Sequence, residues 1–436
     1  MRPADTSIAD TSAAETRTPD AHAAEVRALI GPVLARLREA EPDRLTIDAA
    51  GLAGRVLAER MTAAIPLPPF DNSQMDGYAV RASDLAGASE TSPVILALGV
   101  ATAAGDPLAE HVPGTASPVM TGAAVPSGAD AVVPIEAALP PRFPRLVRAH
   151  ETAPPAGEAA FTAPVAPGTF VRPRGDDVAE GALLGRAGQV LTPARIGALA
   201  AAGVTEVLVR RRPRVLICAT GDELAERGET LPVGRIHDAN TPMLAAMLRE
   251  AGARVSVARC ADDPEAMLRL LEAAPRTADF AVTSGGISAG AFEVVREALE
   301  PLGGRFASIA MQPGGPQGLA EAPLPVVCFP GNPVSSWLSA ELFLLPLLRE
   351  YAGRAAAAAR EPRPLARGTA SPPNKLQLRR GRIEADGSVV LSAPGSHLLG
   401  DLADAEVIAE IPIGVGDAPA GMIVQTWKTA PTWRSA

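Results

Sequence analysis

The stretch PRVLICATGDE (213–223) is an apolar, strand-forming run that leads directly into a loop with two carboxylates. The same arrangement recurs in ADFAVTSGG (278–286) and in PVVCFPGNP (325–333). Helical patterns lie between these runs, as in TPMLAAMLREAG (241–252) and DPEAMLRLLEAA (263–274). Strands that alternate with helices in this way predict a doubly wound α/β sheet. In such sheets the ligand binds beyond the carboxyl ends of the strands, which is where these loops are expected.

The expected helices begin and end with recognisable capping signals. In Asn240–Thr241–Pro242 and in Asp263–Pro264, a residue with a capping side chain precedes a first-turn proline. Asn332 precedes Pro333 in the same way, so it is expected to cap the closing helix, although it could also line a ligand pocket. ARIGALAAAG (194–203) predicts a short helix with its last glycine at the C-cap.

The composition changes along the chain and predicts a multidomain α/β-plus-β protein. The first residues are rich in Ala, Thr, Asp and Ser, a composition typical of disorder. Apolar residues at helical spacing follow in AEVRALIGPVLARLREA (24–40) and again in AAGLAGRVLAERMTA (49–63). Elsewhere, outside the α/β region, short strand-like runs are separated by Gly and Pro turns. The expected division is a disordered tail (1–22), an extended linking domain (23–65 and 150–203), a β-rich domain (66–149), the central α/β domain (204–355) and a small C-terminal β-barrel (360–436).

Charge and cysteine usage exclude several classes of protein. The net charge of -9 argues against a nucleic-acid binder, which would normally carry a basic face. The basic clusters Arg210–Arg214 and Arg379–Arg382 are interpreted as solvated or strand-flanking charge first and as anion contacts second. Three scattered cysteines and five scattered histidines form no disulfide or zinc signature and suit a reducing compartment. No membrane span or secretion signal is predicted, so a soluble cytoplasmic protein is expected.

The polar loops of the α/β region hold the first candidate site residues. Burying Asp222 and Glu223 would be costly without a cation, which indicates either metal coordination or the capping of a helix. Asp238 has the same two interpretations, and oxygen ligands without His or Cys suit Mg²⁺ rather than zinc. The glycines of SGGIS (284–288) would let backbone N–H groups approach a phosphate, or would only make a tight connection. PGNPVS (330–335) forms a turn into the closing helix and has the same alternatives.

Three further segments are too polar and too rich in turn residues to belong to a core. Loops of this kind often carry function on a rigid scaffold, although each could be an ordinary surface turn. They are FDNSQMDGYAV (70–80) with Asp71 and Asp76, MTGAAVPSGADAVVPIE (120–136) with Thr121 and Glu136, and VRPRGDDVAEG (171–181) with Arg174 and Asp177.

Taken in order, these segments resemble the MoeA family of molybdopterin molybdenumtransferases, which includes the C-terminal part of gephyrin. The motifs are FDNSQMDGYAVR, MTGAAVPSGADAVVPIE, RPRGDD, ATGDEL, GRIHDANTPML, TSGGISAG, MQPGGP and FPGNPVSS. The resemblance runs from about residue 25 to the C-terminus. It implies an elongated homodimer whose α/β domain is MoaB/MogA-like, that is, shared with molybdopterin adenylyltransferases. The family's site is expected between the α/β domain of one subunit and the β-rich domain of the other.

The activity that the resemblance implies is molybdenum insertion. Adenylylated molybdopterin is cleaved, molybdate joins the dithiolene, and AMP leaves with Mg²⁺ involved. The residues carried over as catalytic are Asp71, Asp177, Glu223 and Asp238, of which Glu223 and Asp238 would hold the metal. The residues carried over as ligand contacts are Thr121, Arg174, Ser284, Gly285, Gly286, Ser288, Pro330, Gly331, Asn332, Pro333 and Ser335. Contacts with a molybdopterin adenylyltransferase and with molybdoenzymes are implied as well, but none with nucleic acid or membrane.

The chain also departs from the family pattern. Gly315 stands where a basic residue is usual, and Gln312 stands where another often occurs. Losing one cation beside an anionic ligand could cost about 1.5–3 kcal/mol, unless a nearby residue such as Arg296 compensates. Glu293 and Arg296 also replace the family's usual Asp and Lys. Two alternatives therefore stay open: a non-catalytic paralogue that binds or delivers molybdopterin or the finished cofactor, and an enzyme that inserts tungstate.

Overall fold

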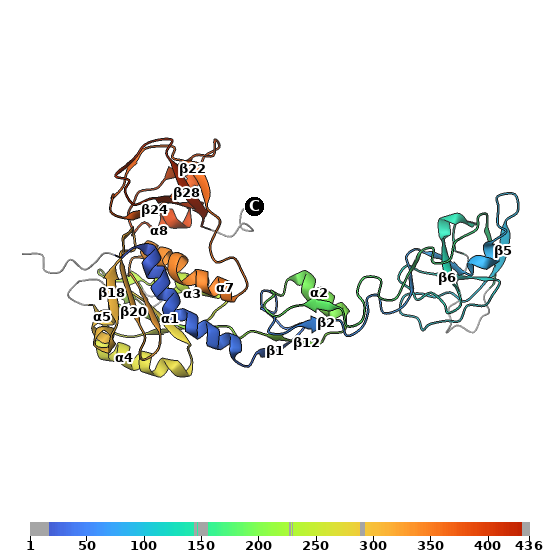
Figure 1. Cartoon of the computed structure of the whole chain (residues 1–436), viewed down its shortest axis with the longest axis horizontal. Helices are drawn as coiled ribbons and strands as arrows, with labels where there is room; N and C mark the ends of the chain where they lie inside the picture. The colour runs from blue at the N-terminus through green and yellow to red at the C-terminus, as the bar shows by residue number, and fades with distance from the viewer. Residues whose placement is uncertain are drawn as a thin grey trace, which may run out of the picture.

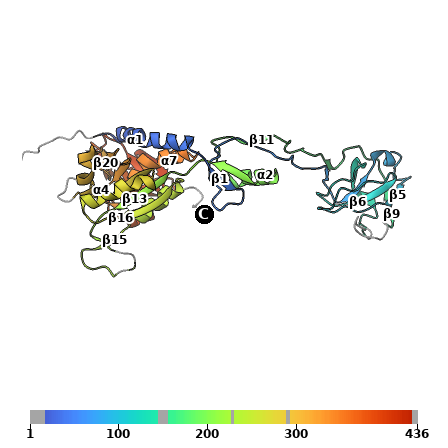
Figure 2. The same cartoon turned by 90° about the horizontal axis from the view of Figure 1, so that it is seen from below.

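The computed structural model describes residues 17–143, 146, 156–225, 228, 230–287 and 293–429. The chain is extended, with an α/β unit and a C-terminal β unit together at one end and a β-rich unit at the other (Figure 1). A narrow middle part joins the two ends, and the view turned by 90° shows the same arrangement (Figure 2). These units correspond in outline to the domains expected from the sequence. The exact domain boundaries stay a prediction.

The predicted α/β sheet is confirmed, with two antiparallel strands added at one edge. Its strands, in spatial order, are β16 (Arg254–Arg259), β13 (Arg214–Ala219), β17 (Phe280–Ser284), β21 (Val326–Phe329), β20 (Pro316–Ala320) and β18 (Arg305–Ser308). The first four strands are parallel, and β20 and β18 run antiparallel to their neighbours. The helices that follow them are α3 (Asn240–Glu250), α4 (Pro264–Ala273), η3 (Ala274–Arg276), α5 (Val294–Leu299), η4 (Glu300–Leu302), α6 (Pro333–Ser339), the π-helix η5 (Ala340–Leu344) and α7 (Leu345–Tyr351).

The central strands of this sheet are buried on both faces, and successive side chains of a strand point into opposite cores. Ile217 lies in one core, which the sheet shares with α3, α6 and α7. Its neighbour Cys218 lies in the other core, which the sheet shares with α4 and α5. Burial raises the pKa of the Cys218 thiol to about 12, as it does for Cys328. Cys260 is only partly buried.

The N-terminal helix α1 (Pro19–Glu39) begins earlier than the sequence predicted. The Thr18 side chain accepts a hydrogen bond from the Ala21 N–H, and Pro19 opens the first turn. The expectation of a disordered tail is therefore wrong for residues 19–22, while residues 1–16 lie outside the described part of the chain. The apolar face of α1 lies in the same core as β13 and α7. This face consists of Val26, Ile30, Val33 and Leu34.

The middle part contains one predicted helix and lacks another. Its elements are β1 (Asp43–Thr46), β2 (Met61–Thr62), β11 (Leu183–Gly185), α2 (Pro193–Ala201) and β12 (Glu206–Val209). α2 and the C-terminal Gly203, with φ 81°, are confirmed. The helix predicted over 49–63 is wrong, because Gly51 and Gly54 adopt φ of 75° and 80°, which a helix does not allow. The apolar residues of that stretch, such as Leu52 and Leu57, are buried against α2 instead.

The β-rich unit is built on one six-stranded sheet in the order β7-β4-β6-β5-β9-β8. Its elements are β4 (Gly77–Val80), η1 (Ala82–Leu85), β5 (Val94–Leu98), β6 (Thr115–Val119), β7 (Ala131–Pro134), η2 (Ile135–Ala137), β8 (Ala138–Leu139) and β9 (Glu158–Phe161). A two-stranded pair, β3 (Asn72–Ser73) with β10 (Val171–Arg172), joins this unit to the middle part.

The C-terminal unit is the predicted small β structure, and it is anchored on the α/β unit. Its elements are β22 (Glu361–Pro364), β23 (Thr369–Ala370), β24 (Leu376–Ile383), β25 (Val389–Leu391), α8 (Leu399–Ala403), β26 (Val407–Ile411), β27 (Asp417–Ala418) and β28 (Ile423–Lys428). A strand of the α/β unit, β19 (Met311–Gln312), pairs with β24 and extends this sheet. Trp337 of α6 also stacks on Trp427 of β28, with ring centroids 5.6 Å apart.

None of the described helices has the length and apolar character needed to cross a lipid bilayer.

His22 is an unusual buried group on α1. Its side chain is 2% exposed, neither ring nitrogen has a hydrogen-bond partner, and the ring packs edge-on against Phe343. Burial, and secondarily the charge of Arg17, lower the pKa of His22 from 6.5 to about 4.

We therefore expect His22 to make the fold acid-sensitive. Between pH 6.5 and about 4 the unfolded chain binds a proton that the folded chain does not bind, so stability falls as the pH falls. The full loss would be about 3 kcal/mol. In His22→Leu, urea unfolding at pH 7 and pH 4.5 should show a smaller difference in stability than in the parent protein. His237→Leu, at an exposed position, is the control, and equal pH dependence in the parent and His22→Leu would contradict the assignment.

Candidate functional site

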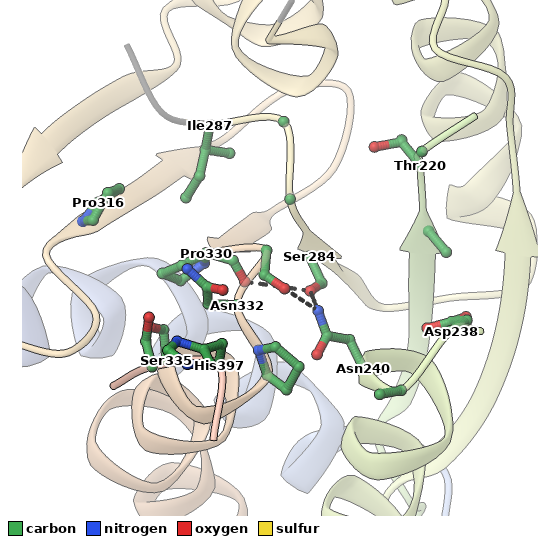
Figure 3. Close-up of a pocket in the computed structure, with 18 of the residues that line it drawn as sticks. Thr220, Asp238, Asn240, Ser284, Ile287, Pro316, Pro330, Asn332, Ser335 and His397 are labelled. Atoms are coloured by element: carbon green, nitrogen blue, oxygen red, sulfur yellow. Dashed lines mark hydrogen bonds between the residues drawn. The ribbon is translucent and has the colours of Figure 1, made fainter. Parts of the chain in front are cut away.

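A cavity of about 980 Å³ lies at the carboxyl ends of β13, β17 and β21. The three parallel strands end side by side, so the loops that follow them meet at one edge of the sheet. Ser284, the last residue of β17, lines the cavity together with Thr220 and Pro330, which directly follow β13 and β21 (Figure 3). The cavity position predicted from the strand pattern is therefore confirmed. The cavity lies there because the three strands run in the same direction, so that their carboxyl ends meet at one edge of the sheet.

Glycine is required where two of these loops approach each other. Gly285 and Gly286 have φ of 95° and 64°, so both lie in the left-handed region that favours glycine. A Cβ on Gly286 would lie 3.1 Å from the Val295 backbone nitrogen, and one on Gly331 would lie 3.4 Å from the Gly285 Cα. The two loops thus pack backbone against backbone at the floor of the cavity. Because these glycines have no side chains, the space beside the main chain stays open for a ligand.

Asn240 connects the two loops. Its Nδ2 donates to Ser284 Oγ at 2.8 Å and to the Gly331 carbonyl at 2.6 Å (Figure 3). Ser336 Oγ lies 3.1 Å from Ser284 Oγ and donates to the Pro330 carbonyl, which closes the network. The sequence prediction that the Asn240 side chain caps α3 is wrong, because the amide is used in this network instead. Asn240 was not among the predicted ligand contacts.

Asp238 supplies the side chain that satisfies the first turn of α3, although Ala239 occupies the N-cap position. Its Oδ1 accepts a hydrogen bond from the Thr241 N–H at 3.0 Å, and its Oδ2 lies 3.7 Å from the Arg259 guanidinium. The capping interpretation of Asp238 is therefore confirmed. The capping predicted for Asp263 is also confirmed, since its carboxylate accepts from the Glu265 N–H. Asn332 precedes α6 as predicted, but its side chain makes no capping hydrogen bond.

Glu223 stands at the rim of the cavity and is exposed. Gly221, with φ 135°, lets the Glu223 carboxylate fold over the end of β13, because a Cβ on Gly221 would lie 2.7 Å from Glu223 Oε2. Among the residues that the structure describes, no three His, Cys, Asp or Glu side chains form a metal site. Glu223 and Asp238 are nevertheless both among the residues that line the cavity. Mg²⁺ is commonly held by one or two carboxylates together with substrate phosphates, so this pair fits that cation.

One wall of the cavity comes from the C-terminal unit, which the sequence did not indicate. Residues 394–397 line it together with Gln312, Pro313 and Gly314, and His397 is labelled in Figure 3. The adjacent carbonyl groups of residues 392 and 393 are held by the buried guanidinium groups of Arg379 and Arg380. The only sequence signal was the Arg379–Arg382 cluster, which was interpreted as solvated or strand-flanking charge, whereas Arg379 and Arg380 lie inside β24. That interpretation is wrong for these two arginines, because both are buried.

The cavity wall is short of positive charge. Its described lining holds the carboxylates of Glu223, Asp238, Asp262 and Glu293, and it includes no Lys or Arg. Arg296, the residue expected to compensate for the family's missing cation, does not line it. The Arg296 guanidinium donates to the Ile287 carbonyl at 3.3 Å and stacks over Phe306 at 5.0 Å.

The remaining predicted residues form a separate group, which lies on and beside the β-rich unit. Asp71 Oδ1 accepts from the Arg174 N–H at 2.6 Å, because β3 pairs with β10. The N–H and hydroxyl of Thr121 both donate to Asp76, and these bonds lower the Asp76 pKa. Asp71, Thr121, Arg174 and Asp177 are all exposed, and none lines the cavity. Within one chain the predicted site residues thus form two groups. Ser288 lies outside the described residues.

Comparison with known proteins supports one family. The MoeA N-terminal region (domain I and II) matches residues 17–203, and the probable molybdopterin binding domain matches residues 216–350. Molybdopterin molybdenumtransferase 2 of Mycobacterium tuberculosis H37Rv is 39% identical over 88% of this chain and 94% of its own. Molybdopterin molybdenumtransferase of Synechococcus elongatus is 34% identical over 85% of this chain and 91% of its own. The crystal structure of a molybdopterin biosynthesis MoeA protein from Pyrococcus horikosii superposes with a TM-score of 0.72 at 29% identity, covering 92% of this chain and 99% of that one.

The fold and the cavity together define a transferase of molybdenum cofactor biosynthesis. The chain belongs to the molybdopterin molybdenumtransferase (MoeA) family.

Asn240→Ala should destabilise the fold by about 1–3 kcal/mol, because it removes two hydrogen bonds and leaves the Gly331 carbonyl without this donor. Urea unfolding monitored by circular dichroism measures the change. Asn332→Ala is the matched control: its side chain makes no capping bond, so it should stay within about 0.5 kcal/mol of the parent protein. Equal stability of the two variants would show that the Asn240 network does not hold the loops.

Proposed function

We propose that this protein inserts molybdate into adenylylated molybdopterin and releases AMP. The observation that carries the proposal is the cavity at the carboxyl ends of β13, β17 and β21, where two glycine-containing loops meet backbone to backbone. A pterin phosphate or pyrophosphate can approach such loops closely, because no side chain stands in its way. The cavity volume of about 980 Å³ is in the range of small-molecule sites, which suits a pterin nucleotide.

The residues of the cavity can be assigned complementary roles. Asn240 would keep the two loops at a constant separation, so that the phosphates meet a rigid backbone surface. The loop at 394–397 would cover the substrate from the side of the C-terminal unit. Glu223 and Asp238 would hold Mg²⁺ when it binds. The cation would supply the positive charge that favours departure of AMP and that the described lining otherwise lacks.

The second group of predicted residues fits a homodimer. Asp71, Thr121, Arg174 and Asp177 are exposed, and none of them lines the cavity. In the proposed dimer, a second copy would bring these residues to the open side of the cavity. They would contact molybdate or the pterin there. A cytoplasmic location, and hand-over between a molybdopterin adenylyltransferase and a recipient molybdoenzyme, complete the proposal.

A non-catalytic carrier of molybdopterin or finished cofactor is the second candidate. The described cavity lining contains no Lys or Arg, and Gly315 occupies the position of the family's basic residue. Binding without turnover would suit such a lining better than transfer of an oxyanion. Insertion of tungstate differs only in the metal, and the two oxyanions can be compared directly in the same assay.

The decisive measurement is AMP release from adenylylated molybdopterin with Mg²⁺ and either molybdate or tungstate. We expect molybdate-dependent release that falls by about a hundredfold or more in Glu223→Ala, because charge stabilisation at the leaving group is lost. Glu272→Ala, an exposed glutamate of α4 outside the cavity lining, is the matched control and should leave the rate unchanged. Tight pterin binding without AMP release would instead support the carrier, and preference for tungstate would identify the metal.

Gly315→Lys should fold normally and bind the anionic substrate more tightly. Gly315 lacks a left-handed φ, and an added Cβ would approach no atom closer than 3.6 Å. It also lies between Gly314 and Pro316, which both line the cavity. One new charge-assisted hydrogen bond would tighten substrate binding by about tenfold or more. Isothermal titration measures this, with Gly315→Gln as the neutral control, and equal affinity of the two variants would contradict the expectation.

A further inference from the structure

A second, smaller cavity of about 50 Å³ lies where the α/β unit meets the middle part of the chain. Six of the residues that line it are arginines, and no Asp or Glu is among its described lining residues. The arginines are Arg55, Arg210, Arg211, Arg212, Arg249 and Arg354, and we refer to them as the arginine cluster. None of them lines the candidate active site.

The arginine cluster lies at the opposite edge of the sheet from the candidate active site. Arg210–Arg212 connect β12 to the start of β13, and Gly252 in the same lining lies two residues before β16. Arg249 is in the last turn of α3, and Arg354 follows the end of α7. α7 lies on the side of the α/β unit that faces β1 and β12 (Figure 1). The cluster therefore surrounds the joint between the two parts of the chain.

Contacts within the protein account for part of this charge. Arg354 donates to the Glu250 carbonyl, and Arg210 Nη1 donates to the Tyr351 carbonyl at 3.4 Å, so both satisfy C-terminal ends of helices. Such ends favour cations. Arg55 Nη2 donates to Asp43 Oδ2 at 2.7 Å, and Arg211 Nε lies 3.9 Å from Asp43 Oδ1. The contacts of the cluster thus include one carboxylate and the carbonyl ends of two helices. Their negative charge is too small to balance the positive charge of six guanidinium groups.

The like charges repel one another in a partly buried place. Burial first, then Arg55, Arg254 and Arg354, lower the pKa of Arg212. Burial and the nearby Arg38 similarly lower the pKa of Arg210. Arg55, only 8% exposed, cannot move away into solvent without giving up its bonds to Asp43 and the Arg210 carbonyl. A bound anion would relieve this repulsion.

We propose that the arginine cluster is a binding site for a tetrahedral oxyanion of the phosphate and molybdate class. Guanidinium groups present planar pairs of N–H donors that match the oxygens of such anions. A cavity of about 50 Å³ has room for a few water molecules, which suits one such anion and excludes a nucleotide. Gly54 and Gly252 leave the space beside the arginines open.

The bound anion would stabilise the joint between the α/β unit and the middle part. It would bridge the connection from β12 to β13, the segment at Arg55 and the ends of α3 and α7, which approach the cavity from different directions. The joint is also relevant to the candidate active site, because it determines the direction in which the β-rich unit extends from the α/β unit (Figure 1). The site itself does not depend on the proposed function.

Isothermal titration of the full-length protein with inorganic phosphate, and separately with molybdate, tests the proposal at constant ionic strength maintained with chloride. We expect saturable phosphate binding that weakens by about tenfold or more in Arg212→Gln. Arg305→Gln, which changes an exposed arginine of β18 outside both cavities, is the matched control and should bind as the parent protein does. Molybdate that competes with phosphate, and whose binding falls in Arg212→Gln, would identify the metal oxyanion as a second source of the ligand.

Thermal unfolding separates a binding role from a structural one. In chloride, Arg212→Gln should unfold at the same or a higher temperature than the parent protein, because repulsion is removed. With phosphate, the parent protein should gain thermal stability and the variant should not. The proposal would be overturned by non-saturable phosphate binding, by unchanged binding in Arg212→Gln, or by a variant that weakens self-association but still binds phosphate. The last result would mean that the cluster faces acidic residues of a second copy.

Discussion

The structure depends on the parallel pairing of three central strands. Ala219 of β13 pairs with Ser284 of β17, and Ser284 pairs in turn with Phe329 of β21, so the three strands end at the same level. A parallel sheet must be covered on both faces, which explains the continuous apolar runs of these strands. The polar groups that follow them can gather only at the shared edge, and that edge becomes the wall of the cavity.

Two other parts of the chain complete this edge. Asn240, at the start of α3, holds the loops after β17 and β21 at hydrogen-bonding distance of each other. The C-terminal unit adds the wall at 394–397, and it is kept in place by the pairing of β19 with β24 and by the stack of Trp337 on Trp427. The cavity is therefore a product of two units, and movement of the C-terminal unit would open it.

Charge is distributed unequally between the two edges of the sheet. The carboxyl edge carries Glu223 and Asp238 with no Lys or Arg in its described lining. The amino edge carries the arginine cluster. An acidic lining favours a cation between protein and phosphate, whereas a cluster of guanidinium groups favours direct contact with an anion. The two edges therefore suit different ways of holding an oxyanion.

The sequence by itself determined the α/β sheet, the loops after its strands and the capping by Asp263. These features depend on the spacing of apolar residues, on glycines and on capping side chains, all of which act over a few residues. It misjudged 49–63, where Gly51 and Gly54 outweigh an apolar pattern, and residues 19–22, where Thr18 and Pro19 start a helix. Only the tertiary structure decided that Asn240 joins two loops, that residues 394–397 reach the cavity and that six arginines from separate segments converge. Those contacts join residues far apart in the chain, and their formation depends on how whole elements pack.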